Sequence, residues 1–581
     1  MKKILHYLWS WPSLRGVLFV VSAVTLTVIQ EPIGWSFLAW VALVPFILAC
    51  SPAAKPVPLA VFVYVVSLFY WLWNLYWIYP VTPLGWLAFC MYTALLWPIV
   101  ALCLRWCRIK KIPLFLAVPV LFVGAERLQG LFLGGFFWRF LAHSQYANIT
   151  LIQIADIFGA AGVSFLIAMV NGLAAELILM VRLKTQDQRL KLSANRGIAI
   201  VLKTSLVIAA VVGAIFYGRW RISQSDKFIE AGPLVASLQS NVPQSVKKSH
   251  QASDVTFDEL LSSSKAGMEA GAELVVWPET MVHAILEPRV LRLLDSSDTD
   301  KILDEALKKH SKNKAFVLVG AYGGEPEIEE DLTIRLSQRY NSAFLYQPDG
   351  QQSDKQYSKI HLVPFGEFVP FKKSFPLLYG LLMKFTPYDY DYTLDAGSEY
   401  TVFEMRSEGG RVYKFGVMIC YEDAVPAIAR RFAKSEQGIK GLHWLINISN
   451  DGWFVRFKEG KVFPSTELGQ HAAICVFRAV ENRLAVVRSV NTGISCLIDT
   501  LGRIKNGFLA GSLPQQAMAR TGMAGWFVDR VPIDKRTTFF SKYGQWLDFF
   551  CVVCLFLTII VSFWERFIRN KKYIRWQKIG K

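Results

Sequence analysis

Apolar segments long enough to cross a lipid bilayer constrain this chain more than any other feature. Seven of them occupy the first 217 residues, and one more lies near the C-terminus. A spanning helix needs about 20 mostly apolar residues, because a bilayer offers its backbone no hydrogen-bond partners. The sequence therefore predicts an α-helical transmembrane bundle of about eight spans, at residues 17–29, 35–50, 57–78, 84–104, 112–124, 162–181, 198–217 and 549–564.

Composition and charge also indicate a membrane protein. The chain has 581 residues, of which 53% are hydrophobic, and a formal net charge of +18. Lys and Arg cluster beside the apolar segments, at residues 105–111, 182–196 and 566–572, and no basic motif stands outside these flanks. Cations in such positions favour contact with a membrane surface over contact with nucleic acid. We therefore expect a lipid bilayer as partner and no nucleic acid.

The basic loops predict how the chain is oriented. With the N-terminus in the cytoplasm and eight crossings, the strongly basic loops and the tail from residue 566 onward all fall inside, as the positive-inside rule requires. The polar part then falls outside, which in a bacterium is the periplasmic side of the inner membrane. Three parts result: a transmembrane domain at 1–217, an outer domain at 218–547, and a last span with a cytoplasmic tail at 548–581.

The outer domain alternates strand-like and helix-like segments. Its short apolar runs predict buried strands at residues 234–238, 274–277, 315–321, 415–419, 444–448, 485–488 and 495–498. Longer patterns predict helices at residues 257–270, 301–310 and 466–481. Such alternation is typical of an α/β domain whose sheet is covered on both faces.

Three patterns in the outer domain place a reactive side chain directly after a strand-like run. Glu279 follows Val275-Val276-Trp277-Pro278, Cys420 follows residues 415–419, and Lys359 opens an apolar run that ends at Glu367. Each has a plainer interpretation when taken alone: a carboxylate in a turn, a surface lysine, or a core cysteine. The few cysteines of this domain match neither a disulfide framework nor the spacing of zinc ligands.

Taken together, a carboxylate, an ammonium and a thiol make chemical sense. A thiol must lose its proton to become a nucleophile, and a carboxylate within hydrogen-bond reach can take that proton. An ammonium can stabilise the oxyanion that forms when the thiolate attacks a carbonyl, and losing one such donor typically costs about 3–4 kcal/mol. This chemistry needs no metal and no cofactor, so we expect neither.

These patterns, in this order, resemble the Glu-Lys-Cys triad of the nitrilase superfamily. The whole chain resembles its membrane-embedded branch, the apolipoprotein N-acyltransferases. The residues that carry the resemblance are Trp277-Pro278-Glu279, Lys359 with residues 361–370, Cys420-Tyr421-Glu422, and the segments 126–128, 134–138, 239–244 and 449–454. Residues 505–542 match the family poorly.

The resemblance implies a fold and a set of roles. The fold would be a four-layer α-β-β-α sandwich attached to the transmembrane bundle. Glu279 would be the general base, Lys359 the stabiliser of the oxyanion and Cys420 the nucleophile. The residues expected to support the site or to bind substrate are Glu367, Tyr421, Glu422 and Trp453.

The reaction implied by the resemblance has two steps. Cys420 would take an acyl chain from a membrane phospholipid as a thioester, and the N-terminal amine of a diacylglyceryl-cysteine on an apolipoprotein would then accept it. The protein would work as a monomer. The apolar run at residues 375–385 would be a lid or a membrane-dipping loop, or alternatively a core helix.

Two other functions stay open on the sequence alone. One is a membrane-tethered amidase or hydrolase with the same triad and water as acceptor, although such an enzyme needs only one anchor. The other is a transporter or receptor with a catalytically inactive outer domain. Ionisable residues inside the spans would mark a transport path, and few are present, chiefly Glu126, Asp156 and Glu176.

Overall fold

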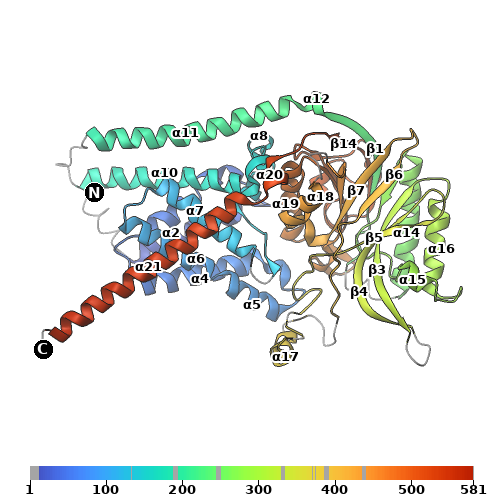
Figure 1. Ribbon diagram of the computed structural model, residues 1–581, viewed down its shortest axis with the longest axis horizontal. Coiled ribbons are helices and arrows are strands. Elements are labelled where there is room, and N and C mark those ends of the chain that lie inside the picture. Colours follow the sequence, from blue (N-terminus) through green and yellow to red (C-terminus); the bar gives the residue numbers. More distant parts are fainter. Residues whose placement is uncertain are drawn as a thin grey trace.

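The computed structural model describes residues 12–579 apart from 132–133, 187–193, 244–249, 329–333, 370, 373, 385, 387–391 and 435–439. Long helices gather at one end of the molecule and two sheets with their covering helices at the other (Figure 1). The helices of the bundle are α2 (Pro12–Val28), α4 (Pro56–Asn74), α5 (Pro83–Thr93), α6 (Leu96–Ile109), α7 (Leu114–Gln129), α10 (Ala160–Gln186), α11 (Ala194–Ser223) and α21 (Trp546–Ile579).

Five helical stretches among the described residues are long and apolar enough to cross a membrane: Pro56–Asn74, Pro83–Ile109, Ala160–Val181, Gly197–Ser223 and Trp546–Ile568. The three other predicted spans correspond to shorter helices. Residues 35–50 form a 3-10 helix, η1 (Ser36–Trp40), and a separate helix, α3 (Val44–Ala49). Pro45 lies in the first turn of α3, where its missing N–H is tolerated, so a new helix begins there.

Basic residues gather at one end of the bundle. Arg108 donates to the carbonyl oxygens of Ile47, Leu48 and Cys50, which α3 leaves unpaired at its C-terminus. Lys110, just beyond α6, pairs with Glu565 of α21 at 2.6 Å. Helix α21 leaves the sheets and runs to the far end of the bundle (Figure 1), so this cluster lies on the side away from the sheets.

The outer domain contains two six-stranded sheets. The first has the order β14-β1-β2-β3-β4-β5, with strands Gly525–Asp534, Ile229–Gln239, Leu274–Val276, Phe316–Ile328, Ile334–Tyr346 and Gln352–Ser358. The second has the order β13-β12-β11-β8-β7-β6, with strands Ile504–Lys505, Cys496–Ile498, Ala485–Asn491, Trp444–Asn450, Val412–Ile419 and Val402–Arg406. In each sheet the central strands are parallel and the outer ones antiparallel.

The two sheets pack face to face and helices cover their outer faces. Ser489 of β11 donates to backbone carbonyls of β1 and β2, and Ser237 of β1 donates to the Arg488 carbonyl, so the contact includes hydrogen bonds. Helices α14 (His250–Glu269) and α16 (Thr299–Ser311) flank the first sheet, and α18 (Pro426–Ala433) and α19 (Thr466–Asn482) flank the second (Figure 1). The predicted four-layer sandwich is confirmed.

The stretch that matched the family poorly closes the first sheet. Strand β14 pairs antiparallel with β1, from Ile229 opposite Asp534 to Gln239 opposite Gly525. A short helix, α20 (Phe539–Tyr543), follows and leads into α21. Residues 505–542 therefore cover a sheet edge and return the chain to the bundle.

Glycine allows close approach of helices in the bundle. A Cβ on Gly172 of α10 would lie 2.3 Å from the Leu114 carbonyl oxygen of α7, whereas a Cβ on Gly213 of α11 would meet nothing within 4 Å. Small residues at such contacts let helix backbones pack closely where no hydrophobic effect assists.

We expect Gly172→Ala to lower the thermal denaturation midpoint of the detergent-solubilised protein, because overpacking costs about 1–3 kcal/mol. The control Gly213→Ala adds the same methyl group in open space, where the gain in helix propensity is about 1 kcal/mol. Its midpoint should stay unchanged or rise. Equal midpoints for the two variants would contradict the close α7–α10 contact.

Candidate active site

Cys420 lies at a sharp turn at the end of β7. It opens the 3-10 helix η5 (Cys420–Ala424) with a φ of 55°, in the left-handed region that non-glycine residues rarely adopt. Such backbone strain persists only where surrounding contacts hold it, and it concentrates at functional sites. Cys420 is partly exposed, whereas Cys475 and Cys496 are fully buried. Among the three cysteines of the outer domain, Cys420 is the accessible one.

The Glu422 carboxylate holds this turn in place. It is fully buried and accepts hydrogen bonds from the backbone N–H groups of Ile419 at 2.7 Å, Ile360 at 2.8 Å and His361 at 2.9 Å, and from the Tyr357 hydroxyl. Burial raises the pKa of Glu422 to about 7, although the backbone donors oppose that rise. Glu422 therefore joins the turn after β7 to the turn after β5, and it supports the site without lining it.

Glu279 lies just beyond β2 and is 5% exposed. One carboxylate oxygen accepts from the Asn341 side chain at 2.6 Å, and the other accepts from the Asn450 backbone N–H at 2.7 Å. The Lys359 ammonium lies 3.7 Å from the first oxygen. Both oxygens of this carboxylate thus have fixed partners from both sheets.

Lys359 is 1% exposed and lies between two carboxylates. Its Nζ contacts both oxygens of Glu367 at 2.8 Å, and Glu367 also accepts from the backbone of Val363 at 2.8 Å. Burial alone lowers the pKa of Lys359, but the charges of Glu367, Cys420 and Glu279 outweigh burial and hold that pKa above its usual value. The ammonium is therefore a permanent cation in the site.

The surroundings of Cys420 oppose ionisation at rest. Burial raises the pKa of its thiol, and the Glu279 charge raises it further, whereas Lys359 lowers it. The net pKa lies above the usual value, so the resting group is a protonated thiol. A thiol beside a buried carboxylate and a buried ammonium is the arrangement that base-assisted nucleophilic attack needs.

Asparagines complete the site, and the sequence did not indicate them. Asn341 bridges the two carboxylates, since it donates to Glu279 at 2.6 Å and to Glu367 at 3.1 Å. Asn447 of β8 donates to the Cys420 carbonyl at 3.1 Å. Asn341 lies on β4, a strand whose first half is largely exposed and has no continuous apolar run, which explains why the prediction missed it.

Tyr421 connects the site to the membrane bundle. Its hydroxyl accepts from the Phe137 backbone N–H at 2.8 Å and donates to the Gly135 carbonyl at 3.2 Å, and its ring stacks on Trp138 at 6.2 Å. Gly135 has a φ of 84°, and a Cβ there would lie 2.5 Å from the Gly130 carbonyl oxygen. The loop between α7 and α10 therefore reaches the residue next to Cys420.

Trp453 ends the short 3-10 helix η6 (Asp451–Trp453), which follows β8, and is half-buried. The next residue, Phe454, packs edge-on against Trp77 of the bundle at 4.8 Å. Trp453 thus belongs to a second loop that joins the outer domain to the bundle.

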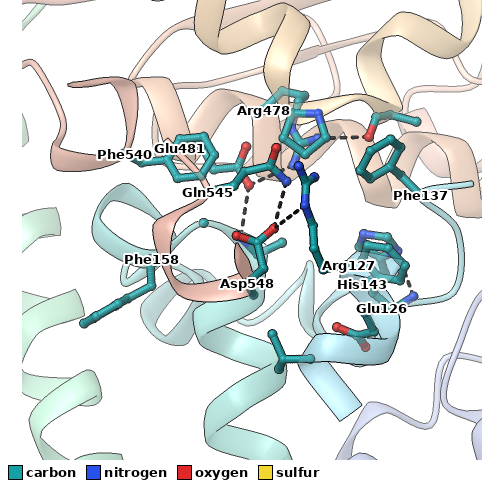
Figure 2. Close-up of a pocket in the computed structure, with 17 residues that line it drawn as sticks. Glu126, Arg127, Phe137, His143, Phe158, Arg478, Glu481, Phe540, Gln545 and Asp548 are labelled. Carbon is teal, nitrogen blue, oxygen red and sulfur yellow. Dashed lines mark hydrogen bonds and ion pairs between the residues drawn. The ribbon is translucent and has the colours of Figure 1, made fainter. Parts of the chain in front are cut away.

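A cavity lined by both apolar and charged side chains lies behind the turn at Cys420, between the bundle and the outer domain (Figure 2). Arg478 of α19 donates to the Ala424 carbonyl at 3.0 Å and to Glu481 at 2.8 Å, and Glu481 also accepts from the backbone of Ala160 at 2.9 Å. Asp548, at the start of α21, also lines the cavity and accepts from Gln545 at 2.9 Å. The Glu481–Ala160 contact joins the outer domain to the bundle at this cavity.

Among the described residues, one group of metal-binding types lies close together: Asp451, Glu467 and His471. His471 Nδ1 lies 3.1 Å from Glu467 and 3.3 Å from Asp451, which is within ion-pair range, but it makes no hydrogen bond among the described residues.

Comparison with known proteins agrees with this architecture. Residues 234–510 match the carbon-nitrogen hydrolase family, and residues 22–173 match the apolipoprotein N-acyltransferase N-terminal domain. An apolipoprotein N-acyltransferase from Geobacter metallireducens is 30% identical over 580 residues, which is 95% of this chain and 96% of the relative. Another, from Treponema denticola, is 24% identical over 561 residues, which is 93% of this chain and 94% of the relative.

Among solved structures, an amidase of the nitrilase superfamily from Nesterenkonia aligns with 55% of this chain and 93% of its own, with 15% identity and a TM-score of 0.33. The outer domain is of the nitrilase, or carbon-nitrogen hydrolase, class. The chain as a whole belongs to the apolipoprotein N-acyltransferase family and is an acyltransferase.

We expect Glu367→Gln to abolish most activity and to destabilise the protein. It leaves the buried Lys359 with one carboxylate, and breaking a buried ion pair costs about 3–5 kcal/mol. Glu404→Gln is the control, because Glu404 pairs with Lys414 at 3.3 Å on the surface. A surface ion pair contributes only about 0–1 kcal/mol to stability. Acyl transfer and thermal denaturation would be measured for both, and wild-type behaviour of Glu367→Gln would contradict the role of this pair.

Proposed function

We propose that this protein transfers a fatty acyl chain from a membrane phospholipid to an apolipoprotein by a two-step mechanism at Cys420. The observation that carries the proposal is the turn at Cys420, whose thiol is influenced by the buried charges of Glu279 and Lys359. All three groups come from one chain, so a single copy holds a complete site.

In the first step Glu279 removes the thiol proton as the sulfur attacks an ester carbonyl of the phospholipid. A C–S bond forms, and the carbonyl electrons move to oxygen, where the Lys359 ammonium stabilises the negative charge. The intermediate collapses, the ester C–O bond breaks, and Glu279 returns the proton to the departing alkoxide. A lysophospholipid leaves and an acyl thioester remains on Cys420.

In the second step the N-terminal amine of a diacylglyceryl-cysteine attacks the thioester. Glu279 takes a proton from the amine, Lys359 stabilises the second oxyanion, and the C–S bond breaks. The thiolate recovers a proton and the amide product leaves. The net reaction exchanges an ester for an amide, with no redox change.

The site lies where two lipid substrates would meet. The loops at Tyr421 and Phe454 join it to the bundle, so a bilayer around the bundle would lie beside the nucleophile. By the positive-inside pattern of the sequence, this side would face the periplasm.

The apolar run near the site is exposed and is no core helix. Helix α17 (Pro376–Met383) has no buried residue, and Leu377 and Leu381 are 94% and 52% exposed. In Figure 1 this helix stands off the body of the molecule. An apolar helix in that position fits insertion into the membrane surface, where it would admit lipid substrates to the site.

We expect a hydroxylamine-labile acyl mass on the Cys420 peptide after the purified protein is incubated with phospholipid vesicles. Thioesters are cleaved by neutral hydroxylamine and amides are not. Cys475→Ser should keep the adduct and Cys420→Ser should lose it. If folded wild-type protein carries no acyl mass and releases no lysophospholipid, the phospholipid-donor mechanism is wrong, and transfer to water from short amides would be tested instead.

We expect Leu377→Asp with Leu381→Asp to slow acylation of Cys420 by vesicle phospholipid about tenfold or more, since a charge at a lipid interface opposes insertion. Ile302→Asp is the control, because Ile302 on α16 is similarly exposed, at 54%, and belongs to the outer layer of the sandwich. Equal rates for all three proteins would exclude membrane insertion of α17.

A further inference from the structure

A buried cluster of charged side chains lies beneath the nucleophile turn, and the chemistry described above does not use it. The His471 cluster consists of His471 and Glu467 of α19, Asp423 of η5, Asp451 of η6 and Arg488 of β11. All five side chains are at most 2% exposed. Burying this many charges is unfavourable unless they compensate one another, so a functional role would explain why the cluster is present.

The contacts of His471 determine its protonation. Nε2 lies 2.7 Å from Asp423, and Nδ1 lies 3.1 Å from Glu467 and 3.3 Å from Asp451. Of these contacts only the one to Asp423 is a hydrogen bond, and the two at Nδ1 are ion-pair distances. Three carboxyl groups around one imidazole favour its protonated form, because an opposite charge within about 4–6 Å raises the pKa of a base.

Charge balance within the cluster agrees with an imidazolium. Burial lowers the pKa of His471, but Asp423 and Asp451 together raise it well above the usual value. Burial, and next the charge of Asp451, raise the pKa of Glu467 to about 7. With Glu467 protonated, the charges of His471 and Arg488 equal those of Asp423 and Asp451, and the cluster is neutral.

The cluster connects the two turns on which catalysis depends. Asp423 lies in the turn that Cys420 opens, and it also pairs with Arg488. Asp451 follows Asn450, whose backbone N–H holds Glu279 at 2.7 Å. His471 contacts both aspartates, so it fixes the nucleophile turn relative to the residue that holds the base.

We infer that His471, kept as an imidazolium, is a positioning residue that joins these two turns and favours the thiolate form of Cys420. This inference rests on the proposed role of Cys420 as nucleophile. The charged groups that act on the thiol are Glu279, Lys359, Asp451 and His471, and of these Lys359 and His471 lower its pKa while Glu279 and Asp451 raise it. His471 is thus a second cation beside Lys359.

The alkylation rate of Cys420 tests the inference. Iodoacetamide reacts with the thiolate, so below the thiol pKa its rate falls tenfold for each unit by which that pKa rises. Mass spectrometry of the Cys420 peptide follows this residue alone, and the partly exposed Cys554 in the same sample reports reagent activity. No lipid substrate is present, so the outcome does not depend on which acyl donor the enzyme uses.

We expect His471→Gln to slow alkylation of Cys420 about tenfold at every pH from 7 to 9, because a nearby charge shifts a pKa by about one unit. Asp451→Asn should change the rate in the opposite direction, because it removes an anion. His443→Gln, at a half-buried histidine outside the cluster, should match wild type. If His471→Gln does not fold, the faster rate of Asp451→Asn still tests the electrostatic part.

Two outcomes would overturn the inference. The first is an alkylation rate that does not follow the charges. Either Cys420 reacts at the wild-type rate in a His471→Gln protein that thermal denaturation shows to be folded, or His471→Gln and Asp451→Asn shift the rate in the same direction. The second is a stoichiometric divalent ion, found by elemental analysis of the wild-type protein, whose removal by a chelator reproduces the rate of His471→Gln. The compensating charge would then be an ion, not a proton on His471.

Discussion

The buried ammonium of Lys359 is the interaction on which the rest of the site depends. Removing an ammonium from water costs several kcal/mol unless carboxylates compensate it, and here Glu367 and Glu279 do so. Those carboxylates need donors for their remaining lone pairs, and Asn341 with the Asn450 backbone N–H provides them. Asn341 lies within β4 of the first sheet, whereas Asn450 ends β8 of the second. The complete set of contacts around Lys359 and its carboxylates therefore needs both sheets.

Face-to-face packing of the sheets explains why residues far apart in the sequence meet. Glu279 and Lys359 follow strands of the first sheet, and Cys420 and Asn450 belong to the second. The Glu422 carboxylate then joins the turn after β5 to the turn after β7. Its bonds hold the left-handed backbone of Cys420, a conformation that costs about 1–3 kcal/mol without such support. The strain is thus compensated by a contact between sheets.

The sequence predicted the parts of the fold that have a continuous apolar pattern and missed the parts that do not. Each predicted buried strand lies within an observed one or extends at most one residue beyond it, whereas β5 consists almost entirely of polar residues and gave no signal. Asn341 was missed for the same reason, although it contacts two predicted residues. Residues 35–50 were predicted as one span from their hydropathy, which is insensitive to the start of a new helix at Pro45. The exposure of α17 could not be predicted from the sequence, because an apolar run has the same composition in a core and on a surface.

The environment of Cys420 bears on why a nitrilase-type domain in this family acts in a membrane. Burial and the Glu279 charge raise the pKa of the Cys420 thiol, so the proposed nucleophile is protonated, and therefore weak, at rest. Cys420 is only partly exposed, and in the proposed chemistry this would slow the attack of water on a thioester that waits for an amine. Contact of Tyr421 with the loop at Gly135 extends this enclosure to the bundle. In the proposed chemistry, the enclosure that keeps the thiol unreactive at rest therefore also favours transfer of the acyl group to a lipid-borne amine over its transfer to water.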